Sequence, residues 1–148
     1  MGIEENKKTL QRNIDEMMNN GDYSKANEIM HEDYVSPRGG GIEESKQHRD
    51  FLWTSVPDAH IEILDMIAEE DKIAVWQKVK GTFTGGLYGL KGKGQSFDRV
   101  YASIYEFKDG KIIRSSNREV IDTLSFFQQL GVLPSTEEIV KAYNDSLK

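Results

Sequence analysis

The stretch KIAVWQKVKGTFT, residues 72–84, decides the fold class of this 148-residue chain. Apolar side chains such as Ile73, Val75 and Val79 alternate along it with polar ones. Such alternation is typical of a β-strand that turns one face to a core. Gln77 falls on the apolar face, where an amide without a partner costs about 1–3 kcal/mol. Either another protein group satisfies Gln77, or the side chain lines a pocket and meets a ligand or water.

Three further stretches repeat this near alternation of β-branched or aromatic residues: Ala59–Glu69, Ser96–Lys108 and Lys111–Ile121. Short turn signals such as Asp109-Gly110 separate most of the four stretches. The glycine-rich segment Gly81–Gly94 is the exception and predicts a long hairpin. Strands joined in series by short turns favour an antiparallel meander over βαβ units.

Helical patterns precede and follow these strands. Leu10, Ile14 and Met17 lie at the spacing of one helix face. We expect the other helices to end at Met30, to run over Ile42–Val56 and Thr123–Leu130, and to continue from a capping box at Ser135 to about Leu147. The chain therefore predicts one α+β domain over residues 1–148, a cone-shaped barrel with N-terminal helices packed on a curved antiparallel four-stranded sheet. A pocket is expected between the two layers.

Composition excludes several functional classes. The sequence has 19 Lys+Arg, 25 Asp+Glu, no cysteine and only three histidines. The missing thiols exclude disulfides, zinc-thiolate sites and cysteine nucleophiles. The net charge of −6 argues against nucleic acid and anionic membranes as partners. Without a signal peptide pattern or a metal or phosphate motif, we expect a cytoplasmic protein that uses no metal or cofactor.

Asp122 is the main candidate for chemistry, and two interpretations of it stay open. It directly precedes the helix predicted to begin at Thr123, so its carboxylate can cap that helix. It also follows a strand at the expected mouth of the cone, where it can act as a general acid and base. The two roles differ chemically, because a capping carboxylate has a lowered pKa, whereas a base that works near neutrality needs a raised one.

The other candidates are of two kinds. Some carry a polar group that can orient a carbonyl group, and the others carry an aromatic ring that can line an apolar pocket. The polar ones are Gln77, Arg99, Asn117 and Arg118, and the aromatic ones are Tyr34, Trp53 and Tyr101. Arginines among acidic neighbours more often form salt bridges, and aromatic residues at these spacings more often belong to the core. Both interpretations therefore stay open for these residues.

An ordered series of short motifs extends over most of the chain. The motifs are Val56-Pro57-Asp58, Ile67–Val75, Gly81–Gly85, Asp109–Ile112, Asp122 and Gln129-Leu130-Gly131. In this order they resemble the SnoaL-like polyketide cyclase family, within the nuclear-transport-factor-2-like superfamily. The resemblance runs from about residue 4 to Pro134.

The resemblance implies a cone-shaped barrel that dimerises through its sheet and encloses a hydrophobic pocket for a small hydrophobic molecule. It implies intramolecular aldol ring closure without metal or cofactor, with Asp122 matched to the catalytic acid/base by its spacing to Gln129-Leu130-Gly131. Phe83, counted among the pocket residues, stands where many members carry His. Two alternatives stay open. One is a binding protein without catalysis, and the other is a hydrolase of the epoxide-hydrolase type, with Asp122 and Arg99 or Arg118 around one water.

Overall fold

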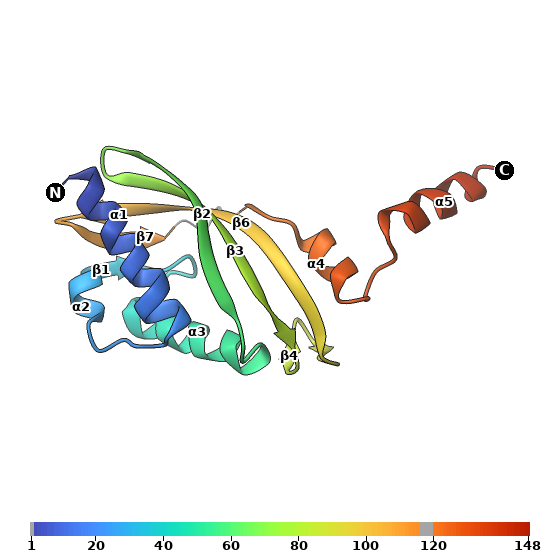
Figure 1. Cartoon of the computed structure of the whole chain (residues 1–148), viewed down its shortest axis with the longest axis horizontal. Coiled ribbons are helices and arrows are strands. Elements are labelled where there is room, and N and C mark those ends of the chain that lie inside the picture. The colour runs from blue at the N-terminus through green and yellow to red at the C-terminus, as the bar shows by residue number, and fades with distance from the viewer. Residues whose placement is uncertain (1, 116–119) are drawn as a thin grey trace.

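The computed structural model of the chain describes residues 2–115 and 120–148 (Figure 1). The first elements are α1 (Ile3–Arg12), the π-helix η1 (Asn13–Asn19), α2 (Ala26–Ile29), β1 (Met30–Val35) and α3 (Ile42–Ser55). The strands that follow are β2 (His60–Glu69), β3 (Lys72–Phe83), β4 (Gly86–Leu87), β5 (Leu90–Lys91), β6 (Gln95–Lys108), β7 (Lys111–Ser115) and β8 (Val120–Ile121). The chain continues into α4 (Thr123–Gln129) and α5 (Thr136–Ser146).

One six-stranded sheet organises the body of the molecule. Its strands lie in the order β1-β7-β6-β3-β2, and β8 also pairs with β6. β3 runs antiparallel to both neighbours, with Gln77 opposite Tyr101 of β6 and Val79 opposite Arg99. The N-terminal helices and α3 gather on one side of this sheet, whereas α5 extends away from the body (Figure 1).

Two apolar clusters hold the helices to the sheet. The first joins α1 and η1 to the strands through Leu10, Met17, Ile73 and Ile112, all at most 1% exposed. The second lies toward α4 and contains Val56, Phe83, Phe97, Phe126 and Leu130. Phe97 and Phe126 meet edge to face in this second cluster, with ring centroids 4.9 Å apart. The clusters leave space between α3 and the sheet, which holds the site described below.

The predicted α+β class, with N-terminal helices on a curved and mostly antiparallel sheet, is confirmed. The prediction of four strands is incomplete, because β1 pairs in parallel with β7. In β1, which has the sequence MHEDYV, the first two residues and Tyr34 are buried and the other three are exposed. The strand therefore lacks the strict alternation that marks the other strands. The stretch predicted as one strand over 111–121 is divided, with β7 ending at Ser115 and β8 beginning at Val120.

The predicted helices are confirmed with small changes of boundary. The capping box at Ser135 is present: its hydroxyl accepts from the backbone N–H of Glu138, and the Glu138 carboxylate accepts from that of Ser135. The helical stripe of Leu10, Ile14 and Met17 is buried, but its second half is a π-helix, which the residue spacing does not predict. Within residues 2–115 and 120–148, no helix is long and apolar enough to cross a membrane.

Gln77 lies on the buried face of β3, as the alternation predicts. Its side chain is 0% exposed. Neither its Oε1 nor its Nε2 has a hydrogen-bond partner among the residues that the structure describes. A buried amide of this kind loses its water without a replacement, so the fold carries an energetic cost at this position.

Replacing this amide with an apolar side chain of similar length therefore stabilises the fold. We expect Gln77→Met to raise the free energy of unfolding by about 1–3 kcal/mol, measured by urea denaturation. Gln95→Met is the matched control, because the Gln95 amide donates to the Leu130 carbonyl at 3.1 Å and accepts from the Lys93 N–H at 2.6 Å. We expect the control to lower stability. A destabilised Gln77→Met would contradict the assignment of Gln77 as an unpaired amide.

Candidate functional site

A cavity of about 430 Å³ lies between α3 and the inward face of the sheet. Its walls are mainly apolar, and α3, β2, β3, β6 and α4 contribute side chains such as Leu52, Ile61, Val79, Phe97 and Phe126. The volume falls in the range of about 300–1,000 Å³ that is usual for small-molecule sites. This space is the candidate site.

Three aromatic residues expected to line an apolar pocket do line this cavity: Tyr34, Trp53 and Tyr101. The Tyr34 hydroxyl lies 2.8 Å from Ser115 Oγ, so it is hydrogen-bonded within the wall. Burial raises the pKa of this phenol, which keeps Tyr34 uncharged at neutral pH. Trp53 carries the guanidinium of Arg49 over its ring, with Arg49 Cζ 4.3 Å from the ring centroid. These rings give the cavity a rigid wall of aromatic character.

Arg99 also lines the cavity. Its guanidinium carbon lies 4.3 Å from the centroid of the Phe126 ring, a cation–π contact. Its Nε is buried and has no hydrogen-bond partner among the described residues. No carboxylate of the described part of the chain lies within ion-pair distance of it. The salt-bridge interpretation of Arg99 is therefore not supported within that part of the chain.

Other predicted site residues lie elsewhere. Gln77 and Phe83 are both fully buried, and neither is among the described residues that line the cavity. Phe83 belongs to the apolar cluster beside α4. Asn117 and Arg118 lie outside the described residues. Gln77 pairs with Ile63 and Tyr101 and lies two residues before Val79, the β3 residue that forms the wall.

Asp122 is the N-cap of α4. Its Oδ1 accepts a hydrogen bond of 2.9 Å from the backbone N–H of Ser125, and its side chain is exposed. The capping interpretation is confirmed. Asp122 is not among the described lining residues, but Phe126, one helical turn further on, is. Asp122 thus lies one helical turn before the residue that α4 adds to the wall, with its own side chain exposed.

Several lining residues were not identified from the sequence: Asn13, Arg38, Ser45, His48 and Arg49. Ser45, His48 and Arg49 are three and four residues apart on α3, so they share one helix face. Burial and the charge of nearby Arg38 lower the pKa of His48, which favours a neutral imidazole near pH 7. The helical spacing of these polar residues is the signal that could have found them.

Asn13 is the most deeply buried of these polar residues. It is 3% exposed, and its Oδ1 has no hydrogen-bond partner among the described residues. It begins the π-helix η1, and such helical irregularities often occur at functional sites. Its amide oxygen is therefore an unused acceptor in the cavity wall. In the part of the chain described, no three His, Asp or Glu side chains come together as a metal site.

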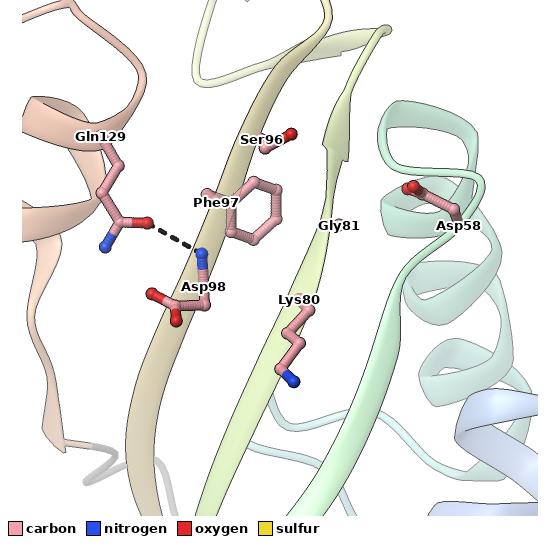
Figure 2. A pocket seen from close by; sticks show the side chains of 7 residues that line it. All are labelled: Asp58, Lys80, Gly81, Ser96, Phe97, Asp98 and Gln129. Atoms are coloured by element: carbon pink, nitrogen blue, oxygen red, sulfur yellow. Dashed lines mark hydrogen bonds between the residues drawn. The ribbon is translucent and has the colours of Figure 1, made fainter.

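A second hollow of about 720 Å³ crosses β3 and β6 at Gly81, between Asp58 and Gln129 (Figure 2). Two of its polar side chains, Asp58 and Gln129, have partners within the protein. Gln129 Oε1 accepts from the Asp98 N–H at 2.8 Å, and the Asp58 carboxylate accepts from the N–H and hydroxyl of Thr82, both at 2.8 Å. The Asp58, Asp98 and Gln129 side chains are exposed. This hollow has the larger volume but is more open than the cavity, and none of its described lining residues has a buried polar atom without a partner.

Comparison with known proteins agrees with this architecture. AclR, a proposed hydroxylase from Streptomyces galilaeus, superimposes with a TM-score of 0.81 at 22% identity, over 99% of this chain and 97% of that chain. TsrD from Streptomyces laurentii gives 0.80 at 21% identity, over 90% and 99%. A SnoaL-like polyketide cyclase from Agrobacterium tumefaciens gives 0.75 at 16% identity, over 84% and 97%. These similarities establish the fold.

Sequence comparison establishes the family. No curated protein matches the chain significantly. The model of the SnoaL-like polyketide cyclase family matches residues 8–130, which is most of the 148 residues. The chain belongs to the SnoaL-like polyketide cyclase family.

Proposed function

We propose that the chain binds a small, mainly apolar carbonyl compound in the cavity and catalyses acid/base chemistry on it without a cofactor, in the manner of a polyketide cyclase. The observation that carries the proposal is the cavity itself, a largely apolar space of about 430 Å³ with unpaired polar atoms of Asn13 and Arg99 in its wall. Apolar walls favour the binding free energy of an apolar ligand by about 25 cal/mol per Å² of apolar surface buried. Polar side chains in the wall, such as Arg99 and His48, orient its polar groups.

The proposed reaction is an intramolecular aldol condensation. A base removes a proton from the carbon next to a carbonyl, the resulting enolate carbon attacks a second carbonyl of the same molecule, and the new alkoxide takes up a proton. The guanidinium of Arg99 borders the cavity and carries several N–H donors, so it can donate to the oxygen that becomes negative. A donor fixed in place before the reaction stabilises this charge more in the transition state than in the substrate.

Two groups are candidates for the base. The resemblance implies Asp122, which caps α4 one turn before the lining residue Phe126. Its carboxylate accepts a hydrogen bond from the Ser125 N–H. His48 lines the cavity, and its lowered pKa favours the neutral, proton-accepting form. We propose Asp122 as the catalytic group and His48 as the alternative.

Substitution at Asp122 distinguishes its role as a helix N-cap from its proposed role as a catalytic base. Asn is as good an N-cap as Asp, so we expect Asp122→Asn to keep the melting temperature, whereas Asp122→Ala lowers stability by about 1 kcal/mol. Asn cannot accept the proton, so Asp122→Asn should abolish enzyme-dependent exchange of the α-protons of 1-tetralone in D₂O, followed by NMR.

The control is His48→Gln. If Asp122→Asn retains exchange and His48→Gln loses it with an unchanged melting temperature, the base is His48 and the proposal for Asp122 is wrong. If the wild-type protein catalyses no exchange but binds the ketone, the second candidate function holds, a binding protein without catalysis. The absence of any carboxylate among the described lining residues favours that second candidate.

Occupancy of the cavity can be tested without knowing the natural ligand. We expect the neutral dye N-phenyl-1-naphthylamine to bind with a rise in fluorescence. Val79→Phe fills the cavity and should weaken binding at least about tenfold, because the added ring takes the space of the dye. Val100→Phe is the matched control on the outward face of the sheet, where Val100 is 37% exposed. Equal loss in both variants would place the dye outside the cavity.

We also propose that two copies of the chain pair through the outward face of the sheet. This face exposes a group of large apolar side chains: Leu64, Ile67, Trp76, Val100 and Ile104. In α5, Ile139, Val140 and Tyr143 are exposed as well, and the helix has no buried residue. Contiguous exposed apolar patches mark interaction surfaces in soluble proteins.

A charge in the middle of this patch should prevent the pairing. We expect light scattering to give the mass of two chains for the wild-type protein and of one chain for Trp76→Glu. Ile3→Glu is the control, since Ile3 is 38% exposed on α1, away from the patch. A wild-type protein with the mass of one chain would contradict the proposed dimer.

A further inference from the structure

The cavity has an unusual distribution of charge. Three arginines line it, Arg38, Arg49 and Arg99, and no Asp or Glu is among the described lining residues. The chain as a whole is acidic, with 25 Asp+Glu against 19 Lys+Arg. The Lys, Arg, Asp and Glu side chains among the described lining residues are thus all positive, against the balance of the protein.

Two of these arginines already have partners. Arg38 Nε lies 2.6 Å from Glu44 Oε1, which neutralises its charge locally. Arg49 donates from Nε to the Met18 carbonyl at 2.9 Å and from Nη2 to the Asn19 carbonyl at 3.3 Å, while Nη1 lies 3.3 Å from Asp50 Oδ1. These contacts fix α3 against η1. Neither arginine needs a ligand to balance its charge.

Arg99 differs from both. One face of its guanidinium is covered by Phe126, and its Nε is buried without an acceptor. It has no carboxylate partner among the residues that the structure describes. Because a guanidinium stays charged at any physiological pH, a half-buried one without a counter-charge is costly. Because Arg99 is partly exposed and borders the cavity, an anionic ligand bound there supplies the missing counter-charge.

We infer that the ligand of this cavity is an anion, an apolar ring system that carries a free carboxylate and that Arg99 binds through that carboxylate. The inference rests on the proposed function, since it names the class of molecule that the same cavity takes. A planar guanidinium matches a carboxylate with two parallel hydrogen bonds. A neutral ester or ketone would accept one hydrogen bond but leave the charge of Arg99 uncompensated.

Matched probes test the charge requirement. Naphthalene-2-carboxylate and its methyl ester share one apolar body, and each can be titrated against the bound dye N-phenyl-1-naphthylamine. We expect the acid to displace the dye at least about tenfold more effectively than the ester, the usual effect of a hydrogen bond to a charged group. Arg99→Gln should remove this preference by weakening the acid alone. Arg114→Gln is the control, since Arg114 lies on the surface with a 60% exposed side chain.

The outcomes are distinct. Equal displacement by acid and ester in the wild-type protein overturns the anion inference and leaves the proposed function intact. A preference for the acid that survives in Arg99→Gln overturns the assignment to Arg99. Failure of the dye, the acid and the ester to bind at all overturns the proposed function instead. Dye binding by Arg99→Gln reports that the variant is folded, and the comparison of acid with ester in the wild-type protein needs no variant.

Discussion

The register between β3 and β6 is the constraint on which the site depends. It sets Val79 opposite Arg99 and Gly81 opposite Phe97, so that Arg99 and Phe97 both point into the cavity. Because side chains alternate along a strand, a shift of one residue would turn Arg99 outward and bring Asp98 or Val100 inward. Gly81 helps to hold this arrangement, since a Cβ there would collide with Val56 Cγ1 at the end of α3.

The helix α4 completes the site through Phe126. Its ring packs edge to face on Phe97 and covers the guanidinium of Arg99. The start of α4 is fixed by the Asp122 cap, one turn before Phe126. Asp122 therefore affects the cavity through the position of Phe126, whether or not it transfers a proton. Removal of the Asp122 cap is expected to change ligand binding by displacing Phe126.

Patterns over a few consecutive residues predicted the helices and strands whose formation depends on those residues alone. The alternation in residues 72–84 placed Gln77 on the buried face, and the Ser135 capping box marked the start of α5. Strand β1 could not be found in this way, because its partner β7 lies about 80 residues away and only their pairing makes MHEDYV a strand. Helical spacing groups Ser45, His48 and Arg49 on one face of α3, but only tertiary packing decides that this face meets the cavity.

Gln77 and Arg99 show why an unpaired polar group alone does not identify a site. Both lie on the inward face of the sheet, two residue pairs apart in the β3–β6 ladder, and both have buried atoms without partners. Gln77 is sealed among apolar side chains, so no ligand can reach it and its unpaired amide only costs stability. Arg99 borders the cavity, where an incoming molecule can supply the missing partner and convert the same kind of cost into binding free energy. Access to a ligand, and not burial, separates the functional group from the structural one.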